Sequence, residues 1–210
     1  MITLQIKRLK KSFGTRNILR DLTLEHAGGV LGISGSNGSG KSTLLKCMAG
    51  LLSPTRGKII WKDGSEKLSR KTVRLRMGYA APYVNLYDEL NSFENLRFLA
   101  NVRHRKEPEG QIAKWIHKLE LQEVGLQPFG NLSTGQQQRL RLASALFHRP
   151  RILLLDEPGS NLDEAGKSLV SDIVRNYRDD HKLLVIASNN RRELDLCGRI
   201  FSVEKQQFIC

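Results

Sequence analysis

The sequence predicts an α/β protein whose parallel-sheet core is interrupted by a helical segment. Three observations support this fold class. A short apolar run at residues 30–34 leads into the glycine-rich loop GSNGSGKST at 35–43. A second apolar run, at 152–155, leads into Asp-Glu-Pro. Short apolar runs of this kind beside helical patterns are typical of buried parallel strands. Between the two runs, from about residue 91 to 147, apolar residues recur with helical spacing.

Strands and one helix are predicted before residue 82. Alternating or continuous apolar runs bounded by turn residues indicate the strands, and apolar residues three and four apart indicate the helix. The predicted strands are residues 2–7, 18–25, 30–34, 58–61 and a stretch within 72–80. The helix runs from Ser42 to Ala49 and stops at Gly50, because glycine commonly ends helices.

Helices dominate the next part of the chain, and strands return after it. The predicted helices are residues 91–102, 109–124, 133–147 and 164–178. The predicted strands are residues 152–155, 183–186 and 200–203. We therefore expect a single domain over residues 1–210, in which 1–82 and 148–210 form the core and about 83–147 form a helical subdomain.

Composition indicates a globular protein without a membrane span. Of the 210 residues, 40% are hydrophobic, and no stretch approaches the roughly 20 apolar residues that span a bilayer. The first residues, MITLQIKRLKKSF, lack the long apolar region of a signal peptide. Three scattered cysteines, Cys47, Cys197 and Cys210, argue against a disulfide framework or a zinc site. We therefore expect a reducing, cytoplasmic setting.

The net charge of +13 is concentrated in residues 58–76 and 97–118, where basic residues outnumber acidic ones. Such segments indicate either contact with nucleic acid or an anionic membrane surface, or a solvated face on a protein that binds a polyanionic nucleotide. Both segments lack the interleaved aromatic residues of a single-strand binding surface, which argues against nucleic acid as a partner.

The loop at residues 35–43 fits the pattern G-x-x-x-x-G-K-[ST], and it lies between a predicted strand and a predicted helix, as that pattern requires. Its glycines let the backbone approach a phosphate, and free amides at a helix start bind anions. We expect Lys41 to reach the β- and γ-phosphates of a nucleotide and Ser42 to bind Mg²⁺. The nucleotide-binding residues of the loop are Gly35, Ser36, Asn37, Gly38, Ser39, Gly40, Lys41, Ser42 and Thr43.

Two acids follow the apolar run at 152–155, at the edge where open α/β sheets bind ligands. Asp156 suits a direct or water-mediated contact to Mg²⁺. Glu157 comes next and is suited to polarise an attacking water molecule. Together with the loop, these acids predict Mg²⁺–nucleotide binding and hydrolysis of a phosphoanhydride.

The strand predicted at 183–186 ends in Ala-Ser-Asn-Asn, residues 187–190. Asn189 and Asn190 donate and accept hydrogen bonds but cannot take up a proton at neutral pH. Because the carboxyl end of this strand meets the same edge of the sheet, its amides are expected to contact the ligand.

Three further stretches carry a resemblance to a known family. LSTGQQQR at 132–139 resembles the LSGGQ signature of ABC-type ATPases, DEPGSNLD at 156–163 resembles their second acidic motif and D-loop, and YDELNSFENL at 87–96 resembles the segment that opens their helical subdomain. The resemblance covers essentially the whole chain, with the motifs in the family's order. It implies a P-loop NTPase fold, with a RecA-like core of mixed sheet, an antiparallel β subdomain and an inserted α-helical signature subdomain.

The resemblance also implies a dimer that binds two ATP molecules with Mg²⁺ between its chains. The phosphate loop and Asp156 would hold ATP and Mg²⁺ from one chain. Ser133 and Gly135 would touch the γ-phosphate from the other chain, and Asp163 would cross the interface. Phe13 matches the family's aromatic residue that stacks on adenine, although a core phenylalanine beside a turn would look the same in sequence.

At three positions the sequence departs from the family pattern. Thr134 replaces the first glycine of the signature, and Pro82 replaces the glutamine of the Q-loop, for which Asn85 is a weak substitute. Asn189 replaces the histidine that contacts the γ-phosphate. Because Asn189 orients groups but does not accept a proton, we expect Glu157 to carry the general-base role almost alone.

Transport is the function that the resemblance implies. Within the family, the sequence most resembles the compact ATPase subunits of the haem exporters of cytochrome c biogenesis, because of its small size, the run LRFLA at 96–100 and Pro82. Such a subunit lies on the cytoplasmic face of the cell membrane. It pairs with a second ATP-binding subunit, which we expect to be identical. It drives a membrane-spanning partner, which is expected to dock near residues 83–105. Two alternatives stay open: a soluble ABC ATPase of iron–sulfur assembly, translation or DNA repair, and a nucleotide-switch regulator with little turnover.

Overall fold

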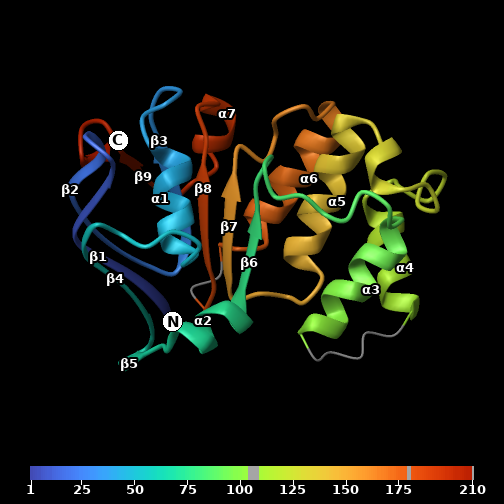
Figure 1. Cartoon of the computed structure of the whole chain (residues 1–210), viewed down its shortest axis with the longest axis horizontal. Helices are drawn as coiled ribbons and strands as arrows, with labels where there is room; N and C mark the ends of the chain where they lie inside the picture. The colour runs from blue at the N-terminus through green and yellow to red at the C-terminus, as the bar shows by residue number, and fades with distance from the viewer. Residues whose placement is uncertain (104–108, 179–180, 210) are drawn as a thin grey trace.

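The computed structural model describes residues 1–103, 109–178 and 181–209, which form two β-sheets with helices around them (Figure 1). The first sheet is antiparallel and has the strand order β2-β1-β4-β5. Its strands are β1 (Ile2–Phe13), β2 (Arg16–Ala27), β4 (Arg56–Asp63) and β5 (Glu66–Lys67). The second sheet has the order β10-β9-β3-β8-β7-β6. Its strands are β3 (Gly29–Ser34), β6 (Met77–Ala80), β7 (Ile152–Asp156), β8 (Leu183–Ala187), β9 (Arg199–Ser202) and β10 (Gln207–Ile209).

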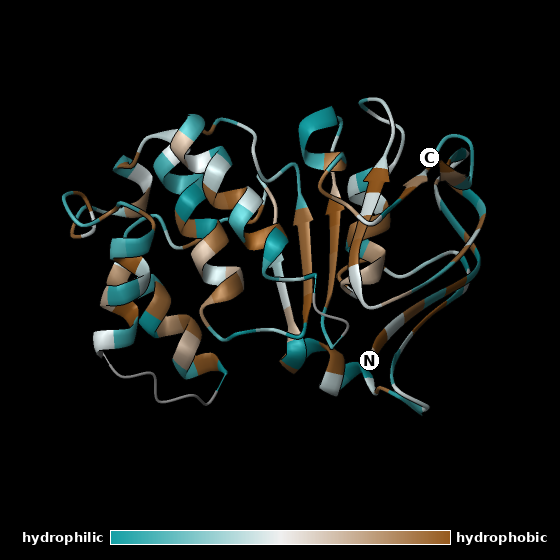
Figure 2. Ribbon diagram, turned by 180° about the vertical axis from the view of Figure 1, so that it is seen from behind, coloured by the Kyte–Doolittle hydropathy of each residue, from teal (hydrophilic) through white to brown (hydrophobic). Residues whose placement is uncertain are grey.

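The second sheet is mixed, because β10 runs antiparallel to β9 while the other neighbours pair in parallel. Every residue of β7 and β8 is buried, as their apolar runs predict, and Figure 2 shows these central strands as hydrophobic. Ala187 pairs with Ile33 on one side and Asp156 on the other. The carboxyl ends of β3, β7 and β8 therefore lie side by side, and the predicted mixed α/β fold is confirmed.

The helices of the described residues are α1 (Lys41–Met48), α2 (Arg70–Arg76), α3 (Ser92–Val102), α4 (Glu109–Lys118), α5 (Thr134–Leu146), α6 (Glu164–Arg175) and α7 (Arg191–Leu194), with a 3₁₀ turn at Phe129–Asn131. Among them, α3, α4 and α5 lie at the end of the molecule opposite the antiparallel sheet (Figure 1). Helices α3, α4 and α5 share an apolar cluster that includes Leu96, Ile116, Leu140 and Phe147. None of the helices in the described ranges has the length and apolarity needed to cross a membrane.

The strand expected within 72–80 is present as β6, but the sequence does not predict the helix α2 that precedes it. Ser69 caps this helix, since its hydroxyl accepts a hydrogen bond from the Thr72 amide at 3.1 Å. The helix expected at 109–124 ends early, because Glu120 adopts a left-handed backbone with φ of 55°. Local capping sets where α2 begins and backbone geometry sets where α4 ends, and the apolar pattern predicts neither boundary.

The first two strands are longer than predicted, with twelve residues each, because their ladder continues through register shifts after Ile6 and Leu9. The short elements β10 and α7 carry too few residues for a periodic signal. Cys210 and part of the expected helical subdomain, residues 104–108, lie outside the described residues. The division of the chain at residues 82 and 148 stays a prediction.

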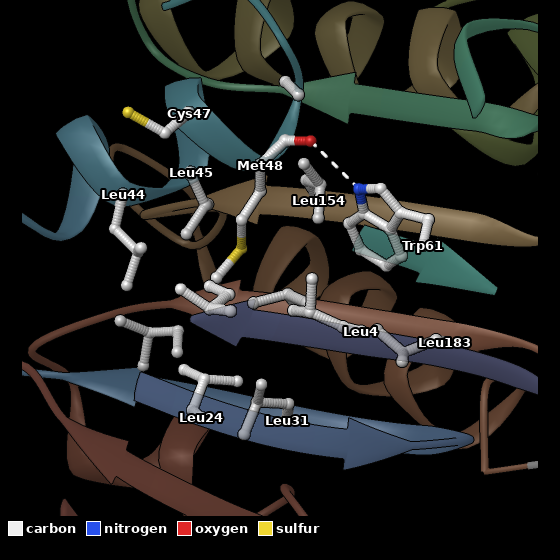
Figure 3. Close-up of a cluster of buried hydrophobic side chains, with 14 of the residues drawn as sticks. Leu4, Leu24, Leu31, Leu44, Leu45, Cys47, Met48, Trp61, Leu154 and Leu183 are labelled. Atoms are coloured by element: carbon white, nitrogen blue, oxygen red, sulfur yellow. Dashed lines mark hydrogen bonds between the residues drawn. The ribbon is translucent and has the colours of Figure 1, made fainter. Parts of the chain in front are cut away.

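The main core lies between the two sheets and is built around α1. Leu4 of β1, Leu31 of β3, Leu44 of α1 and Trp61 of β4 are all buried in it (Figure 3). The Trp61 indole N–H also donates to the Met48 carbonyl, at 3.2 Å, at the end of α1. Burial of each large apolar side chain stabilises the fold by about 1.5–3 kcal/mol. The core therefore fixes α1, and with it the phosphate loop at its N-terminus, against both sheets.

Candidate nucleotide-binding and hydrolysis site

The loop between β3 and α1 has the backbone of an anion site. Gly35, Gly38 and Gly40 have φ angles of 155°, 82° and 103°, in a region that other residues rarely adopt. Gly40 is the N-cap of α1, and a Cβ added there would lie 3.0 Å from Ile18. Since glycine brings no capping side chain, the amides of the first turn stay open to a ligand. Ser42 and Thr43 lie in that first turn.

Lys41 folds back across this loop. It is only 6% exposed, and its Nζ donates to the carbonyl oxygens of Gly35 at 2.8 Å and Ser36 at 3.3 Å. The same ammonium forms an ion pair with Glu157 Oε1 at 3.3 Å. Residues that the sequence predicts from two separate motifs are thus in direct contact, and the charge of Lys41 is held at the mouth of the loop.

Asp156 ends β7 and is 1% exposed. Its Oδ2 accepts a hydrogen bond from the Tyr83 hydroxyl at 2.9 Å. Burial raises the pKa of Tyr83, so this hydroxyl stays protonated and donates. Asp156 Oδ1 is also buried, and it has no hydrogen-bond partner in residues 1–103, 109–178 and 181–209. A buried carboxylate oxygen in this state fits a hard cation such as Mg²⁺, which takes one or two protein ligands beside phosphate oxygens and water.

Glu157 has an unusual backbone for a residue with a side chain. Its φ of 46° lies in the left-handed region, which costs roughly 1–3 kcal/mol outside glycine. Its N–H donates to the Ala187 carbonyl at 2.8 Å, which ties the end of β7 to the end of β8. This turn of the backbone accompanies the ion pair of Glu157 with Lys41.

Asn189 also reaches the phosphate loop. Its Nδ2 donates to Asn37 Oδ1 at 3.0 Å, across 152 residues of sequence. The preceding residue, Ser188, donates its amide to the Ile33 carbonyl at 3.1 Å, so the end of β8 stays beside the end of β3. The amide expected to contact the ligand therefore lies against a side chain of the nucleotide loop.

Glu204 is a site residue that the sequence gives no reason to expect. Its Oε1 accepts hydrogen bonds from the Ser36 amide, at 3.1 Å, and from the Ser36 hydroxyl. These hydrogen bonds lower the pKa of the Glu204 carboxyl. A carboxylate thus accepts a hydrogen bond from a backbone amide of the loop, as expected of a backbone that attracts anions. The contact depends on the turn before β10, a strand too short to predict.

The signature segment begins α5. Ser133 is the N-cap, and its hydroxyl accepts from the Gln136 amide at 3.3 Å while the Gln136 side chain accepts from the Ser133 amide at 2.9 Å. This capping box holds the helix start rigidly. A Cβ added at Gly135 would lie 3.0 Å from the Asn161 carbonyl, so the signature packs closely on the segment after β7.

Asp163 is the N-cap of α6. Its Oδ1 accepts from the Gly166 amide at 2.9 Å and from Arg139 Nη2 at 2.7 Å. The Gly166 amide and the Arg139 guanidinium hold the pKa of this carboxyl below its usual value. Arg139 also bonds Glu120 Oε2 at 2.5 Å, so Asp163 belongs to an ion-pair network on the helical side of the chain.

Phe13 ends β1 and is 52% exposed, so it is not a core phenylalanine. The Lys11 ammonium lies 4.8 Å from the centre of its ring. Pro82 and Asn85 are exposed as well. The residue of this segment that contacts Asp156 is Tyr83, which the sequence does not single out.

The structure gathers one group of predicted residues at the carboxyl edge of the mixed sheet. This group comprises Asn37, Lys41, Asp156, Glu157 and Asn189. Ser133, Gly135 and Asp163 lie instead at the starts of α5 and α6, where Ser133 and Asp163 cap the two helices. An ammonium, an open helix start and two carboxylates in one place suit the binding and cleavage of a phosphoanhydride.

Comparison with known proteins agrees with this chemistry. A family model described as ABC transporter matches residues 19–160. A lantibiotic transport ATP-binding protein of Streptococcus pyogenes is 32% identical over 193 residues, which cover 91% of this chain and 82% of the relative. A glutamate/glutamine/aspartate/asparagine transport ATP-binding protein of Rhodobacter capsulatus is 35% identical over 196 residues, which cover 89% and 74%.

Solved structures show the same fold. A putative ABC transporter ATP-binding protein from Pyrococcus furiosus superposes with a TM-score of 0.80 at 25% identity, over 98% of this chain and 99% of that one. A bacterial ABC transporter cassette in dimeric form also gives 0.80 at 25% identity, over 95% and 93%. The sequence match, the fold and the gathered site agree, and the chain belongs to the ABC transporter family as an ATP-binding domain with ATPase activity.

Proposed function

We propose that this chain closes on ATP against a second such chain and drives a membrane-spanning partner. The observation that carries the proposal is the contact between Lys41 and Glu157, which joins the phosphate loop to the acids at the end of β7. Glycines with open amides, a buried ammonium and two adjacent carboxylates suit one task, the binding and hydrolysis of a nucleoside triphosphate with Mg²⁺.

The phosphates of ATP are proposed to lie over residues 35–43. The open amides at the start of α1 donate to phosphate oxygens, and Lys41 exchanges its carbonyl and carboxylate partners for the β- and γ-phosphates. Ser42 and Asp156 would hold Mg²⁺, which supplies positive charge that offsets the charge developing on the phosphates. The buried, unpartnered Oδ1 of Asp156 supports its part in this assignment within the described residues.

Glu157 is proposed to act as the general base. Once the Lys41 ammonium binds the phosphates, the carboxylate of Glu157 loses its ion pair and is free to accept a proton from the attacking water. Asn189 is proposed to orient the γ-phosphate or that water, since its amide already lies against Asn37 of the loop. An amide cannot take the proton, so Glu157 carries this step almost alone.

The other predicted contacts complete the site in a dimer. Phe13 is proposed to stack on adenine, which its exposed ring permits. Ser133 and Gly135 are proposed to touch the γ-phosphate held by the opposite chain, and Asp163 to lie at the interface. The similarity to a dimeric cassette supports this arrangement.

Replacing Glu157 by Gln tests the proposal. The amide keeps the shape of the side chain but cannot accept a proton, so we expect ATP turnover to fall by about a hundredfold or more while ATP still binds. Steady-state phosphate release and binding of a fluorescent ATP analogue measure the two properties. Glu164→Gln, at an exposed residue paired with Lys167, is the matched control and should turn over normally. Substantial hydrolysis by Glu157→Gln would refute the assignment.

The transported cargo is a finer part of the proposal. Relatives are named for lantibiotics and for amino acids, so their names do not agree on a substrate. The haem exporter of cytochrome c biogenesis is proposed on the run LRFLA at 96–100 and on Pro82, with the chain at the cytoplasmic face of the membrane. Co-purification from gently solubilised membranes should recover a multi-span permease. Its identity tests the haem assignment, whereas recovery of no such protein would favour a soluble role in iron–sulfur assembly, translation or DNA repair, or a regulatory switch.

A further inference from the structure

Tyr83 makes a hydrogen bond to Asp156 that Pro82, its neighbour, cannot make. Proline has no side-chain donor and no backbone N–H. The Tyr83 hydroxyl donates to Asp156 Oδ2 at 2.9 Å, and it is itself hydrogen-bonded to the hydroxyl of Tyr79 on β6. Two tyrosine hydroxyls therefore connect β6 and the segment after it to the carboxylate at the end of β7.

The ring of Tyr83 also contacts the helix α1. The ammonium of Lys46, on α1, lies 3.8 Å from the centre of the ring, which is the geometry of a cation–π contact. The rings of Tyr79 and Tyr83 are tilted at 54° with their centres 6.4 Å apart. Tyr83 thus contacts the phosphate-loop helix and the acidic strand at the same time, although it is 42% exposed.

This contact fixes the orientation of the Asp156 carboxylate. One oxygen, Oδ2, is occupied by the tyrosine, while Oδ1 is buried and has no partner in the described parts of the chain. Groups that hydrogen-bond a metal-binding carboxylate set its orientation and commonly change metal affinity when they are removed. A hydroxyl that holds Oδ2 leaves Oδ1 as the oxygen to face a cation.

We propose that Tyr83 is a positioning residue for the divalent cation of ATP, and that it acts by orienting Asp156 through its hydroxyl. This inference rests on the proposed binding of Mg²⁺ by Asp156. The opposite arrangement, in which the hydroxyl competes with the cation for Asp156, predicts an effect of opposite sign.

Tyr83→Phe tests the inference, because it removes the hydroxyl and keeps the ring under Lys46. Mn²⁺ serves as the probe, and its affinity for the protein saturated with a non-hydrolysable ATP analogue is measured by electron paramagnetic resonance. We expect the affinity for Mn²⁺ to fall about tenfold or more, while binding of the analogue in EDTA is unchanged. Tyr87→Phe is the matched control, since that exposed tyrosine packs its ring on Phe98. An unchanged or a higher affinity for Mn²⁺ in Tyr83→Phe would overturn the proposal.

Two more variants separate this inference from the proposed function. Tyr79→Phe removes the hydroxyl that holds Tyr83, so it should weaken Mn²⁺ binding less than Tyr83→Phe. Asp156→Asn should nearly abolish Mn²⁺ binding; if it binds like the wild type, the assignment of Asp156 to the metal fails. If Asp156→Asn loses the metal and Tyr83→Phe does not, only the role of Tyr83 fails. Thermal unfolding without ligands shows that each variant is folded.

Discussion

At the scale of single residues, the site combines intact charged groups with altered polar ones. Lys41, Asp156 and Glu157 occupy one edge of the sheet, and Lys41 is paired with Glu157 at 3.3 Å. Asn189, at the position where the family has histidine, binds Asn37 at 3.0 Å. The amide reaches the loop and so can orient a phosphate, but it adds no group that exchanges a proton near neutral pH.

Asn189→His should therefore raise turnover. An imidazole at this position adds a hydrogen-bond donor that also titrates near neutral pH. We therefore expect kcat for ATP to rise about three- to tenfold, which is a small part of the rate factor that general acid–base catalysis supplies. Phosphate release measures it, with Asn176→His as the matched control at an exposed position to which no role in the site is assigned. An unchanged kcat in Asn189→His would show that the asparagine already performs the task of the histidine.

At the scale of elements, the sequence predicts best where one local signal acts alone. The apolar runs of β7 and β8 match fully buried strands, and the glycine pattern at 35–43 matches the loop before α1. The contacts of Tyr83 with Asp156 and of Ser36 with Glu204 escape prediction, because they join residues 73 and 168 positions apart. Such contacts follow from strand order, which no local pattern specifies.

The packing of β6 on α5 gives a test at this scale. A Cβ added at Gly78 of β6 would overlap the Ala145 carbonyl of α5, so the strand or the helix must shift. We expect Gly78→Ala to lower the free energy of unfolding by about 1–3 kcal/mol, as overpacking commonly does. Gly110→Ala on α4 is the matched control, since a Cβ there meets no atom within 4 Å in the described residues. Urea unfolding compares the two, and equal stability would contradict the close packing.

At the scale of the whole molecule, the site of one chain is divided between two regions. The phosphate loop lies at the edge of the mixed sheet, while the signature starts α5 on the helical side (Figure 1). Ser133 and Asp163 use their side chains within their own chain, as caps of α5 and α6. The family resemblance predicts that these residues also meet a nucleotide held by another chain.

Dimer formation on ATP is therefore a prediction of its own. Glu157→Gln should double in mass in ATP with Mg²⁺, as measured by light scattering, because it binds ATP without hydrolysing it. Adding Ser133→Asp should keep the protein monomeric, since aspartate caps a helix as well as serine does but places a negative charge against the γ-phosphate. Adding Ser69→Asp instead makes the same change at the N-cap of α2 and should leave the dimer intact. A dimer that survives Ser133→Asp would show that the signature does not meet the nucleotide of the opposite chain, and a Glu157→Gln protein that stays monomeric would point to a different ATPase chain as its partner.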